Sequence, residues 1–392
     1  MEFSEEQEIF LKKIRSWVWQ QNVCNELILT GYAGTGKTTL ISEVKKLAGY
    51  KRIAFLAYTG KASVVLRKKL FDTNNDFNND FIGTIHSFMY KPILRYNQKL
   101  KIEEIIGWEK KEDREIDADM IIIDEASMLD DEITKDIRET FSNIPILYVL
   151  DPFQLPPINQ KFCSLMSSYK ERNIPVYSLT QIHRQNEGNE IIRLSKYLRE
   201  NERIFIKDKK YSDNLSKVKF ESFDKVINKV DMSRNDIVCL THTNKVRNEF
   251  NEKVRQHFKF KHPEPYPNEK VICTQNNRGL GVYNGEIGNV LYSMYEEENI
   301  LNSIIDFEDR VVDLNIDMGR SFGKTKEKKE KGSKLTTFEY GYMITVHKSQ
   351  GSQWNTVILF DIKTMFRDPL DYRRWLYTAI TRSSDKVIIL GD

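Results

Sequence analysis

The residues from Gly31 to Thr38 combine glycines, a lysine and a threonine in the order G-x-x-x-x-G-K-T. Glycines at these positions let backbone N–H groups turn toward a chain of phosphates, and the N-terminus of a following helix adds a favourable dipole. Lys37 would supply positive charge for the β- and γ-phosphates, and the Thr38 hydroxyl is a suitable ligand for Mg²⁺. The apolar run 27–29 enters this loop and a helix-compatible segment leaves it, as a P-loop requires, whereas a chance match would be an ordinary glycine-rich turn. The pattern predicts a nucleoside triphosphate site formed by Gly31, Gly34, Thr35, Gly36, Lys37, Thr38 and Thr39.

A pair of carboxylates, Asp124 and Glu125, follows the apolar run 120–123. In a protein with a phosphate-binding loop, Asp124 can hold Mg²⁺, and Glu125 can orient and deprotonate an attacking water. Because a kinase needs no base for water, the pair favours hydrolysis over transfer to another substrate. The alternative is that the two acids only stabilise the N-terminus of a helix that begins at Ala126.

The composition is that of an ordinary globular protein without a structural metal or a disulfide framework. Of 392 residues, 40% are hydrophobic and 30% are charged, and this length allows two or three domains. The four cysteines are scattered without a C-x-x-C pair, which predicts buried thiols in a reducing compartment. No apolar run has the length of a membrane span and the acidic start is unlike a signal peptide, so we expect a cytoplasmic protein of a bacterial or phage-infected cell. The net charge of +3 neither requires nor excludes a nucleic acid partner.

Alternating strands and helices are expected to position the reactive residues. A helix begins after Ser4, which is a suitable N-cap followed by acids in the first turn. Buried-strand patterns occur at 27–29, 52–57, 120–123 and 144–150, with helix-compatible segments between them. Such alternation, with polar residues at the strand ends, is typical of a doubly wound parallel sheet that binds ligands at its carboxyl edge. We therefore expect a first α/β domain over residues 1–172.

Two insertions interrupt the expected α/β pattern. Within residues 90–117, the two segments 93–96 and 99–102 flank Asn97-Gln98 and predict a small hairpin in the first domain. A second α/β domain is expected over 173–261 and 335–392. It is interrupted by residues 262–334, whose prolines, short alternating strands and Asn284-Gly285 turn predict a small β-barrel. The lysine-rich run 324–331 at its end is either an exposed loop or a contact to nucleic acid.

These motifs, in this order, resemble those of the RecD-like and Dda-like DNA helicases of superfamily 1, which translocate 5′→3′. The resemblance covers nearly the whole chain. Besides the P-loop and the Asp124-Glu125 pair, it includes LDPFQLPP at 150–157, Arg184-Gln185, TVHKSQG at 345–351 and YTAITR at 377–382. It implies two RecA-like P-loop domains of parallel sheets flanked by helices. The first would carry a pin that splits the duplex, and the second an SH3-like barrel. The sequence departs from the family at Leu150, where a glycine is usual.

The resemblance also implies roles around the nucleotide, with ATP and Mg²⁺ as cofactors. Gln7 would read the adenine, and Gln154 would sense the γ-phosphate or its water. Arg184 and Arg382 would act as arginine fingers that neutralise charge in the transition state. Gln350 and Gly351 would contribute to nucleotide binding.

The DNA strand would be held by hydroxyl, imidazole, amide and ammonium groups that contact phosphates and sugars without reading the sequence. The implied contacts are Thr59, Lys61, Thr84, His86, Thr241, Asn244, Thr345, His347, Lys348 and Ser349. For His86 and His347, the alternative is a packed, hydrogen-bonded core histidine.

The expected protein is an ATP-dependent 5′→3′ DNA helicase that acts as a monomer on single-stranded DNA and duplex forks. Single-strand-binding, replication or recombination proteins are candidate partners. Two rival functions stay open. One is a translocase that strips proteins from single strands or serves a nuclease partner, and the other is a nucleotide-switched module that grips single strands without processive motion. Strand-stimulated ATP turnover separates a motor from a switch, and unwinding of a fork separates a helicase from a translocase.

Overall fold

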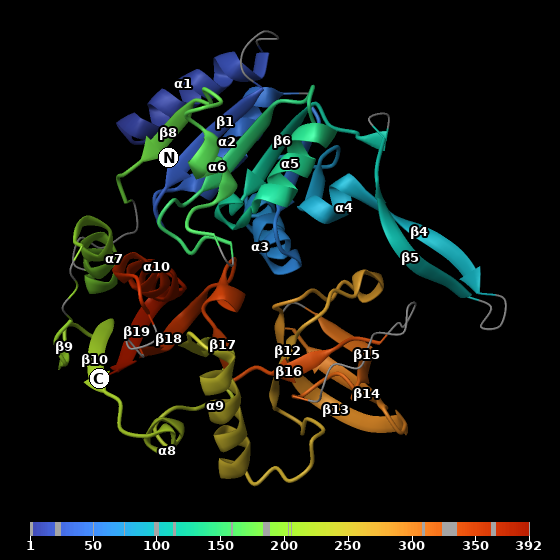
Figure 1. Cartoon of the computed structure of the whole chain (residues 1–392), viewed down its shortest axis with the longest axis vertical. Coiled ribbons are helices and arrows are strands. Elements are labelled where there is room, and N and C mark those ends of the chain that lie inside the picture. Colours follow the sequence, from blue (N-terminus) through green and yellow to red (C-terminus); the bar gives the residue numbers. More distant parts are fainter. Residues whose placement is uncertain are drawn as a thin grey trace. The chain divides into compact units, whose positions relative to one another are not determined.

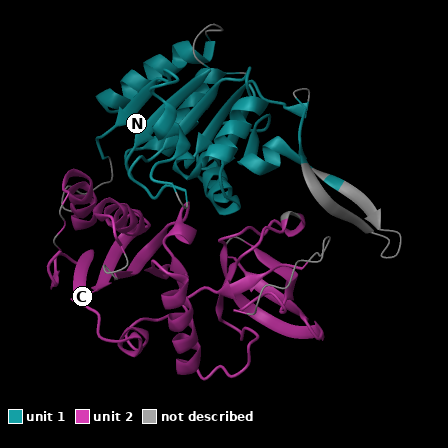
Figure 2. Ribbon diagram, viewed as in Figure 1, with its two compact units in different colours: residues 1–187 teal, residues 188–392 magenta. Residues whose placement is uncertain are grey.

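The computed structural model describes residues 3–19, 25–49, 51–73, 75–97, 102–112, 115–157, 160–182, 189–202, 204, 206–307, 310–323, 335–361 and 366–391. The chain forms two compact units, Met1–Glu187 and Gly188–Asp392 (Figure 2). Among the described residues, no helix is long and apolar enough to cross a membrane.

Unit 1 is built on a six-stranded sheet with the order β3-β2-β6-β7-β1-β8, and every neighbouring pair is parallel (Figure 1). Four of these strands are the apolar runs that the sequence predicted, because strands covered on both faces need continuous hydrophobic residues. The strands are β1 (Glu26–Gly31), β2 (Ile53–Ala57), β3 (Phe81–Thr84), β6 (Met120–Asp124), β7 (Ile146–Leu150) and β8 (Val176–Leu179).

Strand β8 explains why unit 1 extends beyond residue 172, where the sequence placed the end of the first domain. It pairs in parallel with β1, with Ile28 opposite Val176, and so completes the edge of the first sheet. Only its last residue is buried, so it lacks the apolar run that marks the other strands.

Helices cover both faces of this sheet, because alternate strand residues point to opposite sides. Leu27 and Leu29 pack in one core with α1, α2 and α3, whereas Ile28 packs in a second core with α4, α5 and α6. The helices are α1 (Glu5–Trp19), α2 (Lys37–Ala48), α3 (Gly60–Phe71), α4 (Ile85–Met89), the 3₁₀ turn η2 (Ala126–Met128), α5 (Asp131–Thr140) and α6 (Ser164–Ser168).

A separate two-stranded antiparallel ribbon, β4 (Tyr90–Asn97) and β5 (Ile102–Lys110), follows α4. The predicted hairpin is therefore present as a strand pair, but its second strand runs along 102–110 instead of the predicted 99–102. Its base is fixed to α5, because the Tyr90 hydroxyl donates to Asp136 and Lys110 lies 2.5 Å from the same carboxylate. Residues 98–101 lie outside the described residues. The pin role stays a prediction.

Unit 2 contains a second, mainly parallel sheet with the order β17-β11-β18-β19-β10-β9, in which β9 is antiparallel. Its strands are β9 (Lys209–Lys210), β10 (Leu215–Lys219), β11 (Ile237–Thr241), β17 (Met343–Thr345), β18 (Trp354–Asp361) and β19 (Ser383–Gly391). Helices α8 and α9 contribute to a core with β11 and β18, and α10 packs against β18 and α7. These helices are α7 (Glu190–Glu200), α8 (Phe223–Ile227), α9 (Asn244–His257) and α10 (Pro369–Ile380).

A five-stranded antiparallel sheet with the order β15-β14-β13-β12-β16 forms the rest of unit 2. It encloses its own core, to which Val271, Ile305 and Phe338 contribute. The predicted β-rich insertion is thus a sheet, and naming it an SH3-like barrel stays a prediction. Its elements are β12 (Lys270–Cys273), η3 (Arg278–Leu280), β13 (Ile287–Glu297), β14 (Ile300–Asp306), β15 (Val311–Asp317) and β16 (Phe338–Tyr340).

Candidate functional site

The carboxyl edge of the unit 1 sheet gathers most of the residues predicted from the first half of the sequence. Ala57, at the end of β2, lies opposite Thr84 on one side and opposite Asp124 on the other. Thr30, one residue before the P-loop glycine, lies opposite Leu150, which precedes Asp151. Because all six strands are parallel, the P-loop, the carboxylate pair and the loops after β2, β3 and β7 meet at one edge.

The P-loop has the backbone geometry that its glycines allow. Gly34 and Gly36 have φ angles of 86° and 82°, in the left-handed region that favours glycine. Thr35 donates from its hydroxyl to the Tyr32 carbonyl over 2.9 Å, and Lys37 donates from Nζ to the carbonyls of Gly31 and Tyr32 over 2.6 and 3.1 Å. The lysine is therefore folded back on the loop, and a phosphate chain would draw it away by offering a negative charge in place of neutral carbonyls.

Gln7, predicted to read adenine, lies against the P-loop in the structure. Ser4 and Gln7 form a reciprocal capping box at the start of α1, with N–O distances of 3.0 and 3.3 Å. Gln7 also donates from Nε2 to the Thr35 carbonyl over 3.1 Å, and its side chain is buried. The structure thus places Gln7 next to the P-loop, and its role in reading adenine stays a prediction.

Asp124 and Glu125 form a close acidic pair at the end of β6. Glu125 adopts a left-handed backbone conformation with a φ of 53°, and its N–H donates to Asp124 Oδ1 over 2.9 Å. Burial and the neighbouring Glu125 charge raise the pKa of Asp124 to about 6, although Lys69 and Lys37 oppose this shift. Two carboxylates that lie this close together, and whose negative charge nearby lysines neutralise only in part, are a typical environment for a bound cation.

The donor set at this edge fits Mg²⁺ better than a transition metal. No group of three or more His, Cys, Asp or Glu side chains suited to a metal occurs among the described residues. Mg²⁺ usually binds through one or two protein oxygens, with phosphates and waters completing its shell. The Asp124 carboxylate and the Thr38 hydroxyl in the first turn of α2 would be those protein oxygens.

The segment after β7 is held by a fully buried carboxylate. Asp151 Oδ1 accepts a hydrogen bond from the Phe153 N–H over 3.0 Å, and the Gln154 N–H donates to the Asp151 carbonyl over 3.3 Å. Gln154 is itself buried. Leu150, which replaces the usual glycine, is fully buried in the core beneath this edge, so the larger side chain is accommodated by packing.

The predicted strand contacts of unit 1 lie at the starts of two helices. Thr59 and Thr84 are the N-caps of α3 and α4 and accept hydrogen bonds from the N–H groups of Ala62 and Ser87. His86 is exposed and its ring stacks 5.4 Å from that of Tyr90, so the alternative of a packed core histidine is wrong for this residue. Lys61 is partly exposed in the first turn of α3.

The predicted strand contacts of unit 2 meet at the carboxyl edge of its own sheet. Thr241 on β11 lies directly opposite Thr345 on β17, and both are buried. Ser349 is also buried and donates from its hydroxyl to the Val346 carbonyl over 2.7 Å. Burial lowers the pKa of His347, with a further contribution from His242. Lys348 lies in the 3₁₀ turn η4 (His347–Ser349), and Asn244 is exposed at the start of α9.

Three further predicted nucleotide contacts lie in unit 2, and one lies outside the described residues. Arg382 is buried and donates to the carbonyls of Thr378 and Ser352 and to the Thr381 hydroxyl, over 3.1, 3.5 and 3.4 Å. Gln350 is buried, and Gly351 has a φ of 75°. Arg184 lies outside the described residues.

Sequence reasoning missed Glu6, although it is adjacent to Gln7. Its carboxylate accepts hydrogen bonds from the backbone N–H groups of Thr180 and Gln181, over 2.6 and 3.1 Å, and from the Thr180 hydroxyl. It therefore ties the start of α1 to the end of β8. An acid in the first helical turn is usually explained by the helix dipole, so the sequence carried no signal for this long-range contact.

Two family models match the chain. A model described as an AAA domain matches residues 19–219, and one described as a UvrD-like helicase C-terminal domain matches residues 340–390. The ATP-dependent RecD2 DNA helicase of Deinococcus radiodurans is 24% identical over 93% of this chain, and an uncharacterized protein of Methanocaldococcus jannaschii is 26% identical over 93%. This chain spans 47% and 36% of the lengths of those two relatives.

Solved structures of similar fold include two Pif1 helicases. The Bacteroides Pif1 helicase in complex with ADP-AlF3 and single-stranded DNA has a TM-score of 0.60 at 18% identity, covering 100% of this chain and 92% of that one. The Candida albicans Pif1 helicase has a TM-score of 0.58 at 18% identity, covering 100% and 94%. At this identity the likeness concerns the fold.

Proposed function

We propose that this chain, more than half of which matches an AAA domain model, is a superfamily 1 DNA helicase of the RecD-like group that uses ATP and translocates 5′→3′ along single-stranded DNA. The observation that carries the proposal is the carboxyl edge of unit 1. There the P-loop follows β1, and the Asp124-Glu125 pair, in which Glu125 has a left-handed backbone conformation, lies at the end of β6 in the same parallel sheet. Such an edge binds a nucleoside triphosphate and activates water.

The proposed roles follow the chemistry of each group. The P-loop N–H groups and Lys37 hold the phosphates, while Asp124 and Thr38 hold Mg²⁺, which would neutralise phosphate charge when bound. Glu125 accepts the proton of the attacking water. Its fixed left-handed backbone conformation supports this role, because it gives the carboxylate a defined direction.

Arg382 is proposed to compensate charge in the transition state. Three of its hydrogen bonds within unit 2 are 3.1 to 3.5 Å long and go to neutral oxygens. Charged phosphate oxygens attract a guanidinium more strongly than neutral acceptors do, because the two charges are opposite. The side chain can therefore exchange these weak bonds for phosphate contacts.

We propose that the DNA strand is held mainly by backbone N–H groups and exposed side chains. Thr59, Thr84, Thr345 and Ser349 already use their hydroxyls within the protein. In strand binding, these hydroxyls would hold the helical turns in place, so that backbone N–H groups of those turns can contact phosphates. Lys61, His86, Lys348 and Asn244 would supply the side-chain contacts.

The test uses two duplexes that differ only in whether the single-stranded tail is 5′ or 3′. With ATP and Mg²⁺, we expect unwinding of the 5′-tailed duplex and strong stimulation of hydrolysis by single strands. Lys37→Ala should lower stimulated hydrolysis by about 10²-fold or more and leave strand binding measurable. Lys46→Ala, an exposed lysine on the same helix, is the matched control.

Each other outcome changes the proposal in a defined way. Preference for the 3′-tailed duplex would reverse the direction, which rests on the resemblance of residues 151–157 and 345–351 to 5′→3′ enzymes. Stimulated hydrolysis without unwinding would identify a translocase, and hydrolysis that single strands do not stimulate would exclude a motor.

A further inference from the structure

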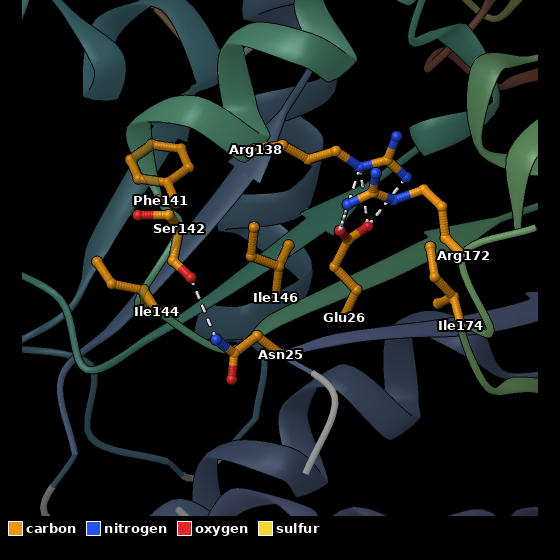
Figure 3. A pocket seen from close by; sticks show the side chains of 9 residues that line it. All are labelled: Asn25, Glu26, Arg138, Phe141, Ser142, Ile144, Ile146, Arg172 and Ile174. Atoms are coloured by element: carbon orange, nitrogen blue, oxygen red, sulfur yellow. Dashed lines mark hydrogen bonds and ion pairs between the residues drawn. The ribbon is translucent and has the colours of Figure 1, made fainter. Parts of the chain in front are cut away.

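A pocket of about 300 Å³ lies at the amino edge of the unit 1 sheet (Figure 3). It is formed where β1 and β7 begin, at the end of α5, and just before β8. Because the strands are parallel, this edge is opposite the one that carries the P-loop. The pocket lies entirely within unit 1, and no role proposed above uses it.

One wall of this amino-edge pocket carries two arginines that share one carboxylate. Arg138 lies 3.0 to 3.1 Å from the Glu26 oxygens through Nε and Nη2, and Arg172 lies 3.4 Å from Glu26 through Nη2 (Figure 3). Glu26 and Arg138 are largely buried, with 12% and 17% of their side chains exposed, whereas 50% of the Arg172 side chain is exposed. The cluster keeps a net charge of +1, which one further anionic group would neutralise.

Arg172 is the arginine with spare hydrogen-bonding capacity. A guanidinium has five N–H donors in a planar fork that matches a carboxylate. Its contact with Glu26 is long and made through a single nitrogen, and its guanidinium makes no other hydrogen bond to the described residues. It can therefore accept a second carboxylate without releasing Glu26.

The rest of the pocket is mixed, with the polar residues Asn25 and Ser142 beside apolar side chains. Phe141, Ile146 and Ile174 line it, and all three are buried. Tyr148 follows Ile146 by two residues on β7, so its side chain points to the same face of the sheet. Its hydroxyl is buried, and burial together with the nearby Glu26 carboxylate raises its pKa, although Arg138 and Arg172 oppose this shift. Apolar side chains beside a few convergent polar groups are the usual character of a ligand site.

We propose that the amino-edge pocket binds an apolar group that carries a carboxylate, with the carboxylate on Arg172 and the apolar part over Phe141, Ile146 and Ile174. Two sources have this chemistry: a free small carboxylate and the C-terminal residue of another protein chain. The proposal does not depend on the proposed helicase activity, since every residue that carries it lies at the opposite edge of the sheet from the P-loop.

The experiment measures binding to the full chain by ligand-observed NMR. The small probe is 3-phenylpropionate, compared with its neutral amide. The peptide probe is an N-acetylated tetrapeptide ending in phenylalanine, compared with the same peptide as a C-terminal amide. We expect each carboxylate to bind at least about tenfold more tightly than its amide, because a charge-assisted hydrogen bond to arginine is lost in the amide.

Arg172→Gln should remove this tenfold preference and leave binding of the amides unchanged, and Arg172→Lys should retain part of it. Arg52→Gln is the matched control, because Arg52 is a half-exposed arginine of unit 1 that pairs with Asp117 and Asp119 away from the pocket.

Tighter binding of the peptide acid than of 3-phenylpropionate would assign the site to a protein chain end, and equal binding would assign it to a free carboxylate. Equal binding of acids and amides, insensitivity to Arg172→Gln, or no binding up to about 10 mM would overturn the proposal.

Discussion

Gln7 donates a hydrogen bond over 3.1 Å to the backbone carbonyl of Thr35 and thereby joins the first turn of α1 to the P-loop. Its other amide atom accepts from the Ser4 N–H over 3.0 Å, so both ends of the side chain are held. A Cβ at Gly36 would lie 2.7 Å from Gln7 Nε2, which explains why a glycine is required beside this contact. The conformation of the P-loop thus depends on a residue 28 positions earlier in the chain.

Gln7→Ala should weaken ATP binding. Loss of one buried hydrogen bond should raise the KM for ATP roughly three- to tenfold with little change in kcat, because the catalytic carboxylates are untouched. Steady-state kinetics with single-stranded DNA in excess measures both constants. Glu8→Ala, an exposed change in the same helical turn, is the control, and a KM equal to that of the wild type would show that Gln7 does not support the loop.

Glu6→Ala should lower kcat and leave the KM for ATP nearly unchanged, which is the reverse of the effect expected for Gln7→Ala. Glu6 fixes the backbone of Thr180 and Gln181, and the chain then continues toward the predicted arginine finger Arg184. We expect kcat to fall about tenfold while the KM for ATP changes little, and Glu6→Gln, which keeps an acceptor oxygen, to fall less. A change confined to KM would contradict this role.

Asp124→Asn should stabilise the protein in the absence of Mg²⁺ while abolishing hydrolysis. The pKa of Asp124 is about 6 in the folded protein, above the value of about 3.9 in an unfolded chain. The charged form is therefore disfavoured by folding, and stability is lost as the pH rises from about 4 to 6. At pH 7.5 the variant should gain about 1–3 kcal/mol in the free energy of unfolding.

Urea unfolding at pH 7.5 and at pH 4 measures this effect. At pH 4 the gain should nearly vanish, because wild-type Asp124 is then neutral when folded. Asp76→Asn, at an exposed position, is the control and should change neither value. A gain that is equal at both pH values would mean that the charge of Asp124 is not its cause.

Glu125→Gln should keep ATP and Mg²⁺ binding and lose turnover by about 10²-fold or more, because the proton acceptor is removed and the metal ligand stays. Equilibrium binding of a fluorescent ATP analogue and single-turnover hydrolysis separate the two effects. Glu132→Gln, an exposed acid of α5, is the control. Collapse of nucleotide affinity would instead make Glu125 a ligand or a structural residue.

Replacing residues 93–108 by a short Gly/Ser linker should abolish fork unwinding and leave strand-stimulated hydrolysis intact. The physical reason is that pulling one strand through a groove opens a duplex only if something blocks the other strand. The design keeps the hairpin base, where Tyr90 and Lys110 contact Asp136 on α5. Unwinding at the wild-type rate after the replacement would exclude the hairpin as the pin.

Local chemistry in the sequence was sufficient to predict the P-loop, the carboxylate pair and the parallel sheets. The G-x-x-x-x-G-K-T spacing requires a particular backbone, and the buried strands are continuous apolar runs, so each signal lies within a few residues. Ser4 and Gln7 also form a capping box that the sequence contained, which places Gln7 at the start of a helix. The weakly apolar β8 gave no such signal.

Only the tertiary structure decided which of these segments are neighbours. Ala57 lies between Thr84 and Asp124 because β2 is placed between β3 and β6, an order set by the crossovers and by packing of helices on both faces. The contact of Glu6 with Thr180, across 174 positions, and the convergence of Glu26, Arg138 and Arg172 arise in the same way. Local propensity fixes the conformation of short segments, but side chains far apart in sequence meet only where the sheet order and its helical layers bring their backbones together.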